Sequence, residues 1–390
     1  MAHPERFAGS LEALHDAARE STGLDDFGDP TYREALEVLL ASLDADATLS
    51  PLGVGIYRGQ LANILATRLR TVQRLKDRPE VGGIEIRRPI VITGLVRTGS
   101  TALHYLLGQD PGLQKLEYWL AAEPQPRPPR DAWQANPAFD AAAKELDFLY
   151  DTTPDLMAVH EMKADWPEEC RHLLHQCFTD DRFETSATLP GYNEWYHGTP
   201  HPETYRWHRR VIQLIGSTDP ERRWLFKYPV HLRQLEALFA VYPDACVVQT
   251  HRDPRTVMAS YTSFITKIRR MHEAEVDPAY IAREQMESWA HAAEAGMRYR
   301  DEHGDDRFYD LDFRDFMADP IDAVRRIYDR FGQPFTAETE RALRAWHDDH
   351  PQGKHGRHGY EKQDIGVSEG EILERFGEYM RRYGLSEEIQ

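Results

Sequence analysis

A short β-branched segment, followed at once by a glycine-containing loop and a helix-forming stretch, is the feature that most constrains this chain. Residues 89–94 read Pro-Ile-Val-Ile-Thr-Gly, a composition typical of a strand that is buried on both faces of a parallel sheet. A loop over 95–99 and an apolar helical stretch over 101–107 come next. Strand, loop and helix in this order are half of a βαβ unit.

The same alternation returns later in the chain. Strand-like runs at 224–227 and 245–250 flank a helical pattern over 231–241, and alternation of this kind predicts an α/β fold whose parallel sheet has helices on both faces. Ligands of such folds bind at the carboxyl ends of the strands. Leucine and alanine recur at helical spacing over residues 7–76, so we expect residues 1–87 to form a helical cap packed on a main domain over 88–390.

Charge and cysteine content limit the partners and the compartment. The chain has 47 basic and 65 acidic residues, a net charge of −18, which disfavours nucleic acid as a partner and requires any anionic ligand to meet a locally basic cleft. Three cysteines are too few for a disulfide framework, and no signal-peptide pattern is recognised, so we expect a cytoplasmic protein. No apolar run approaches the ~20 residues of a transmembrane helix, and no membrane span is expected.

The loop after the first strand has the composition of an anion site. Gly94 to Thr101 fits the G-x-x-x-x-G pattern, with Ser100 where nucleoside-triphosphate loops have lysine. Gly99 allows close backbone approach, and the first-turn amides of the following helix, with the hydroxyls of Ser100 and Thr101, can donate to an anion. Arg97 adds a full positive charge within the loop.

Two further segments carry groups that bind anions. Arg252 lies two residues after the strand over 245–250, and Ser260 lies about two helical turns later, so both can converge on one phosphate. Near the C-terminus, basic and imidazole side chains alternate with glycines over 353–360 and include Lys354, His355 and Gly356. Such a loop can wrap an anion.

Together these segments resemble the sulfotransferases that use 3′-phosphoadenosine 5′-phosphosulfate (PAPS). In that family the 5′-phosphosulfate is held by a Lys/Arg-Ser/Thr-Gly-Ser/Thr-Thr loop, and an arginine and a serine hold the 3′-phosphate. The matching residues here are Arg97, Thr98, Gly99, Ser100 and Thr101 for the loop, Arg252 and Ser260 for the 3′-phosphate, and Lys354, His355 and Gly356 for a closing loop.

The resemblance implies a P-loop, nucleotide-kinase-like three-layer fold with a central four- or five-stranded parallel sheet. It also implies transfer of the sulfuryl group of PAPS, without a metal, to a hydroxyl of a small acceptor. Arg97 and Lys227 are the cations expected to stabilise the charge that develops on the leaving oxygen.

His231 is the first candidate for the general base, and carboxylates are the alternatives. His231 follows Lys227 in a Lys-x-Pro-x-His-Leu segment, although their spacing is longer than in the cytosolic branch of the family, and the ordinary pKa of histidine, about 6.5, suits a base. A histidine after proline at a helix start can instead have a purely structural role. Glu117 and Glu169 are the carboxylate alternatives, followed by His160.

Two other functions are compatible with the loop. A P-loop phosphotransferase would need a nucleoside triphosphate and Mg²⁺, and a nucleotide-binding scaffold would keep the loop without turnover. Cys170, His172 and His175 match no defensible zinc spacing. Five aromatic residues favour a largely apolar acceptor with one hydroxyl, with core packing as the alternative; they are Trp166, Tyr192, Trp195, Tyr196 and Trp207.

Overall fold

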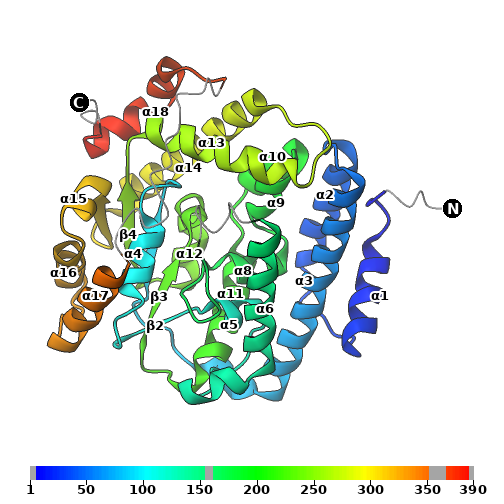
Figure 1. Ribbon diagram of the computed structural model, residues 1–390, viewed down its shortest axis with the longest axis horizontal. Coiled ribbons are helices and arrows are strands. Elements are labelled where there is room, and N and C mark those ends of the chain that lie inside the picture. The colour runs from blue at the N-terminus through cyan, green and yellow to red at the C-terminus, as the bar shows by residue number, and fades with distance from the viewer. Residues whose placement is uncertain (1–5, 154–160, 351–365, 386–390) are drawn as a thin grey trace.

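The computed structural model describes residues 6–153, 161–350 and 366–385 (Figure 1). Within these ranges five parallel strands form one sheet in the order β2-β3-β1-β4-β5. The strands are β1 (Ile90–Gly94), β2 (Leu113–Lys115), β3 (Arg223–Lys227), β4 (Cys246–His251) and β5 (Phe308–Asp312). The prediction of an α/β fold with a four- or five-stranded parallel sheet is confirmed.

The apolar composition of β1 follows from its position in the middle of the sheet. All five residues of β1 are buried, because β3 and β4 pair with it on either side and helices cover both faces. Ile90 and Ile92 pack into one apolar cluster, which also contains Leu103 of α4, whereas Val91 packs into another. A strand that meets apolar neighbours on both faces is built mainly from apolar side chains, and the buried polar residue of β1, Thr93, donates its hydroxyl to the carbonyl oxygen of Pro229 at 2.9 Å.

The sheet is the central layer of three. One face is covered by α4 (Ser100–Leu107), α15 (Phe313–Ala318), α16 (Pro320–Phe331) and α17 (Ala337–Asp349). The helices packed into the cluster of the other face include α11 (Pro202–Ile215), α12 (Leu235–Val241), α13 (Pro254–Arg270), α14 (Pro278–His303) and α18 (Glu369–Tyr383). This is the three-layer arrangement that the alternating pattern predicts.

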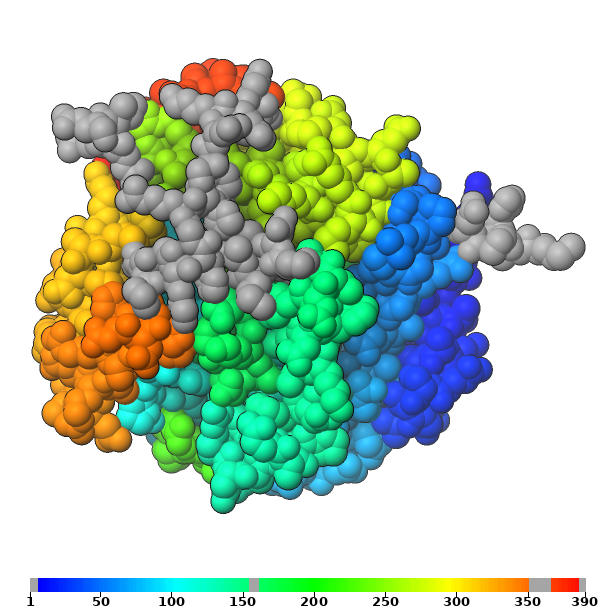
Figure 2. Space-filling model, viewed as in Figure 1, coloured from blue at the N-terminus to red at the C-terminus, as the bar shows by residue number. Residues whose placement is uncertain are grey.

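Further helices surround the second face. They are α1 (Leu11–Thr22), α2 (Tyr32–Ala45), α3 (Pro51–Asp77), α5 (Tyr118–Ala122), α6 (Pro137–Thr152), α8 (Arg171–Leu174), α9 (Arg182–Ser186) and α10 (Pro190–Gly198). Figures 1 and 2 show α1 to α3 on one side of the molecule and α15 to α17 on the other.

The N-terminal helices form where their pattern predicts. Ser50 caps α3 by accepting a hydrogen bond from the amide of Gly53 at 3.0 Å, and Pro51 occupies the first helical position, where its missing N–H costs nothing. The apolar side chains of α1, α2 and α3 join the cluster that contains Phe226 of β3. Because the core is shared, we retain the boundary between a cap over 1–87 and a domain over 88–390 only as a proposal.

Two segments differ from the predicted elements. The helical pattern over 231–241 begins instead as a 3-10 segment, Pro229–Gln234, before α12. The segment 188–202, where the helical pattern of the sequence is interrupted by Pro190, Gly191, Gly198, Pro200 and Pro202, contains a helix of its own, α10, which starts at Pro190. No helix in the described ranges combines the length and the apolar character that a bilayer span needs.

Candidate functional site

The loop between β1 and α4 is shaped by two glycines in the left-handed region. Gly94 has φ of 137°, and a Cβ there would lie 2.3 Å from the carbonyl oxygen of Thr250. Gly99 has φ of 82°, and its Cβ would lie 2.9 Å from the Phe313 ring. Neither position accepts a larger residue without a shift of the loop or of its neighbour. The turn delivers the chain into α4 at Ser100, where first-turn amides have no partner within the helix.

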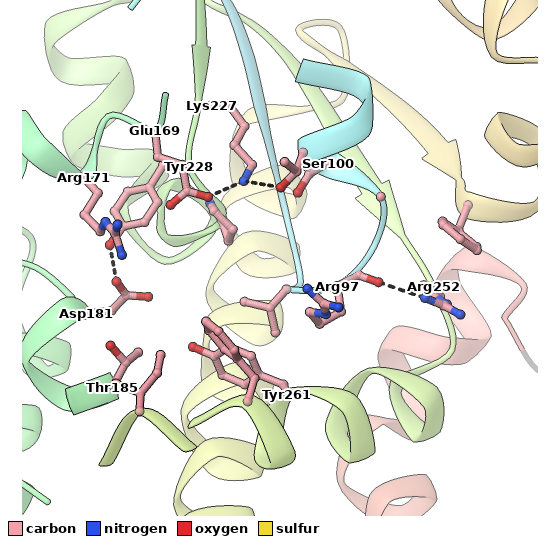
Figure 3. A pocket seen from close by; sticks show the side chains of 17 residues that line it. Arg97, Ser100, Glu169, Arg171, Asp181, Thr185, Lys227, Tyr228, Arg252 and Tyr261 are labelled. Atoms are coloured by element: carbon pink, nitrogen blue, oxygen red, sulfur yellow. Dashed lines mark hydrogen bonds and ion pairs between the residues drawn. The ribbon is translucent and has the colours of Figure 1, made fainter. Parts of the chain in front are cut away.

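A cavity of about 340 Å³ opens beside this loop, at the carboxyl ends of β1 and β3 (Figure 3). Its size falls within the range of small-molecule sites. Seven residues selected from the sequence line it: Arg97, Gly99, Ser100, Thr101, Glu169, Lys227 and Arg252. These residues are separated by up to 155 positions in the chain, and the parallel topology brings them to one edge of the sheet.

The residues assigned to phosphate binding are in mutual contact. Arg97 donates from Nε to Ser260 Oγ at 3.1 Å, and Arg252 donates from Nη1 to the carbonyl oxygen of Arg97 at 3.2 Å. The Arg252 guanidinium also lies over the ring of Phe313, 4.1 Å from its centre. Two cations therefore line one end of the cavity, next to the loop, and the Ser260 hydroxyl, which is not among the lining groups, is hydrogen-bonded to one of them.

Thr98 has a different place from its neighbours. Its hydroxyl donates to the carbonyl oxygen of Leu95 at 2.7 Å and lies 2.6 Å from Thr250 Oγ1. The side chain is buried and does not line the cavity. The Thr98 side chain thus connects the loop to β4 by hydrogen bonding. Only the backbone of Thr98 is available to bind a ligand.

Lys227 and Glu169 form an ion pair in the wall of the cavity. Lys227 ends β3, its side chain is 3% exposed against 16% for Glu169, and its Nζ also donates to Thr101 Oγ1 at 3.1 Å. The backbone holds this pairing, because the amide of Cys170 donates to the carbonyl oxygen of Lys227 at 3.0 Å. One ammonium group thereby stands between a carboxylate and the start of α4 (Figure 3).

His231 does not face the cavity. The 3-10 segment after β3 turns its ring into the core, where the side chain is fully buried and Nδ1 lies 2.7 Å from the hydroxyl of Tyr205. Burial lowers the pKa of His231 to about 3. His231, the first candidate for the base, therefore lies outside the cavity in which an acceptor would bind.

Glu117 is also outside the cavity. It lies before α5, is buried, and forms an ion pair with Arg127 at 3.0 Å in a separate groove. Of the three candidate bases within the described ranges, only Glu169 lines the cavity. His160, Lys354, His355 and Gly356 lie outside the described residues.

The five aromatic residues expected around the acceptor are elsewhere. Tyr192, Tyr196 and Trp207 are buried in the large apolar cluster and Trp195 packs against it, while Trp166 packs on Trp346 with ring centres 5.0 Å apart. None lines the cavity, so the alternative of core packing is the correct one for four of them, and Trp166 lines a different groove. Within the described ranges no three His, Cys, Asp or Glu residues are grouped as a metal site.

Several cavity residues were not selected from the sequence. Arg171, Asp181, Thr185 and Tyr228 contribute polar groups; Tyr261, Phe264, Ile268 and Phe313 contribute rings or apolar surface. Tyr261, Phe264 and Ile268 follow Ser260 at helical spacing on α13, a signal that could have identified them. Phe313 follows β5, a strand that the sequence pattern does not reveal.

Two buried carboxyls near the cavity have raised pKa values. Burial, together with the charge of Glu184, raises the pKa of Asp181 to about 7. Burial and the adjacent Glu169 raise the pKa of Glu168 to about 7. Both shifts follow from placing neighbouring carboxylates where water cannot solvate them.

The protein has a P-loop-like α/β fold. At the carboxyl edge of its parallel sheet, a glycine-containing loop leads from a strand into a helix, as this class requires. Comparison with known proteins makes this class more specific. The sequence matches the profile of the Sulfotransferase family over residues 89–337, which is more than half of the chain. The chain belongs to the sulfotransferase family, and the phosphotransferase reading is set aside.

Two solved structures are similar over almost the whole chain. Sulfotransferase STF1 from Mycobacterium tuberculosis H37Rv is 38% identical, with a TM-score of 0.88 over 96% of this chain and 100% of that chain. Sulfotransferase STF9 from Mycobacterium avium is 26% identical, with a TM-score of 0.90 over 100% of both chains. No curated protein sequence matches this chain.

Proposed function

We propose that this protein transfers the sulfuryl group of PAPS to a hydroxyl of a small-molecule acceptor. The observation that carries the proposal is the convergence on one cavity of the loop, the Lys227–Glu169 pair and the two arginines of the contacting group Arg97, Ser260 and Arg252. These groups supply cations for an anionic donor and a carboxylate for an acceptor proton.

The donor phosphates fit the two ends of the contacting group. The amides that begin α4, with Ser100 and Thr101, suit the 5′-phosphosulfate, because helix N-termini present unpaired N–H groups and a favourable dipole. Arg252 and Ser260 suit the 3′-phosphate. Arg97 lies between them and can donate to either group, since it already contacts Ser260 at 3.1 Å.

Transfer breaks one S–O bond and forms another. The acceptor oxygen attacks sulfur, the bond from sulfur to the bridging phosphate oxygen breaks, and the products are a sulfate ester and 3′-phosphoadenosine 5′-phosphate (PAP). We assign Glu169 as the group that takes the acceptor proton, because it is the candidate carboxylate in the cavity wall. Lys227 and Arg97 neutralise the charge on the departing phosphate oxygen.

Lys227 has two tasks in this scheme. Its contact with Thr101 at 3.1 Å holds it near the start of α4, where the phosphosulfate would lie, while its ion pair with Glu169 orients the base. The transferred sulfuryl group carries less charge than a transferred phosphoryl group, so these cations suffice without a metal.

Nucleotide binding and turnover test the proposal separately. Calorimetry should show that PAP binds about tenfold or more tightly than adenosine 5′-phosphate, because the 3′-phosphate adds charge-assisted hydrogen bonds. Transfer of ³⁵S from labelled PAPS should continue in EDTA. Equal affinities for the two nucleotides, or transfer that EDTA abolishes and magnesium restores, would contradict the proposal.

A further inference from the structure

The cavity extends past the Lys227–Glu169 pair into a region that contains none of the residues assigned to the phosphates of PAPS. On the side away from Arg252 lie Arg171, Asp181 and Thr185, which come from the segment of α8 and α9 (Figure 3). Tyr261 of α13 adjoins them. Because Glu169 belongs to this side of the cavity as well, the region is where an acceptor would sit.

The polar atoms of this region have unused hydrogen-bonding capacity. One carboxylate oxygen of Asp181 accepts from the hydroxyl of Tyr228, and among the described residues no donor bonds to the other. Thr185 donates its hydroxyl hydrogen to the carbonyl oxygen of Arg182 at 2.8 Å, which leaves its lone pairs free to accept. Arg171 lines the cavity, and because its Nε is buried without a hydrogen-bond partner in the described ranges, the terminal amino groups of its guanidinium are the donors that a ligand can reach. The region therefore offers acceptors and a cationic donor side by side.

This combination matches an alcohol better than an apolar group. A hydroxyl group both donates and accepts, so it can donate to Asp181 and accept from Arg171. A purely apolar acceptor would cover these polar atoms without pairing them. Leaving buried polar groups unpaired costs free energy that a hydroxyl would recover.

The adjoining wall is apolar and lies on one helix. Tyr261, Phe264 and Ile268 share a face of α13 and line the same cavity. A saturated ring with hydroxyls at its edge and C–H groups on its face would meet both walls, since aromatic rings pack well against such faces. Sugar and cyclic polyol rings have this character, whereas sterols and long-chain alcohols lack the second hydroxyl.

We infer that the acceptor is a carbohydrate or cyclic polyol, and that Asp181, Thr185 and Arg171 bind a second hydroxyl adjacent to the one that is sulfated. This inference rests on the proposed sulfuryl transfer and names its substrate class. It replaces the expectation of a largely apolar acceptor with a single hydroxyl. The three residues act in acceptor specificity and leave donor binding to the other end of the cavity.

Matched acceptors test the second hydroxyl. Labelled PAPS is offered with n-octyl β-D-glucopyranoside, with n-octanol, which has the same alkyl chain, and with p-nitrophenol. The glucoside should be sulfated with kcat/KM at least tenfold above that of n-octanol. Transfer confined to n-octanol or p-nitrophenol, or to none of the three while PAP still binds, would overturn the inference.

Variants assign the effect to the named residues. D181N keeps an acceptor for Tyr228 but replaces the free carboxylate oxygen with an amide donor, and should lower kcat/KM for the glucoside about tenfold or more; T185V should lower it about two- to tenfold. The control D329N changes an exposed aspartate of α16 and should leave kcat/KM unchanged. Unaltered glucoside kinetics in both D181N and T185V would overturn the subsite.

Calorimetry with PAP distinguishes a defect of the acceptor subsite from a defect of the donor site. PAP affinity within twofold of wild type in D181N and T185V shows an intact donor site, so any loss then belongs to the acceptor. Failure of the wild-type protein to bind PAP would instead remove the proposed function on which the subsite depends.

Discussion

The Lys227–Glu169 pair permits a prediction about both stability and turnover. Lys227 has a side chain that is 3% exposed and Glu169 one that is 16% exposed, so each single substitution leaves a poorly solvated charge without its opposite. Loss of one partner of a buried pair costs about 3–5 kcal/mol. We expect K227M and E169Q each to lower the free energy of unfolding by an amount in this range.

The double variant should be less damaged than the sum of the two. With both charges removed, no isolated charge remains, so K227M/E169Q should recover about 2 kcal/mol or more relative to additivity, within the usual range for contacting groups. Urea unfolding of all four proteins measures this coupling. If the loss of stability in the double variant equals the sum of the two single losses within about 0.5 kcal/mol, the pair contributes no coupling energy.

The same variants separate the two catalytic tasks. Loss of a general base costs about 10²–10⁴ in kcat, so E169Q should fall in that range at saturating PAPS. K227M should lose about 10²–10³, the usual effect of removing a group that stabilises developing charge. Near wild-type kcat in E169Q would move the base elsewhere, and a change confined to KM in K227M would reduce Lys227 to a binding residue.

Three further substitutions have defined outcomes. H231A should lower the free energy of unfolding by about 2 kcal/mol or more, because it empties a buried site and leaves the Tyr205 hydroxyl without its partner. The kcat of the folded variant, measured by ³⁵S transfer, should nevertheless stay within about threefold of wild type. A hundredfold loss of kcat would instead identify His231 as the base. G99A should abolish measurable PAP binding by calorimetry, since its Cβ would lie 2.9 Å from Phe313 at a φ of 82°, and wild-type affinity would show that the loop adapts. Asp181 has a pKa raised to about 7, so its folded form binds a proton that the unfolded chain releases near pH 4. The free energy of unfolding of the wild type, relative to that of D181N, should therefore fall as pH rises from about 4 to 7 and stay constant at higher pH. Urea unfolding measures this difference, and a difference that does not change with pH would contradict the raised pKa of Asp181.

Local sequence was sufficient for the centre of the sheet and for the anion loop. β1, β3 and β4 are central, buried strands, and burial on both faces requires apolar runs that are visible in the sequence. The loop before α4 needs glycine at Gly94 and Gly99 because of close contacts and positive φ. Requirements of this kind act within a few residues, so the sequence carries them directly.

The edges of the sheet left no comparable signal. β2 has three residues, Leu-Gln-Lys, and β5 reads Phe-Tyr-Asp-Leu-Asp. Each is an edge strand that pairs with a neighbour on one side only. A short or polar strand is stabilised by its partner across the sheet, and that partner is distant in sequence.

The choice among candidate bases, and the composition of the acceptor region, depend on tertiary structure. His231 and Glu169 are both plausible bases by residue type, but the 3-10 turn after β3 sends the histidine into the core, while the hydrogen bond from Cys170 to Lys227 brings Glu169 to the cavity. Arg171 and Asp181 stand in a segment without a recognisable motif. Side-chain direction and long-range contact decide these roles, and neither is encoded in the spacing of residues along the chain.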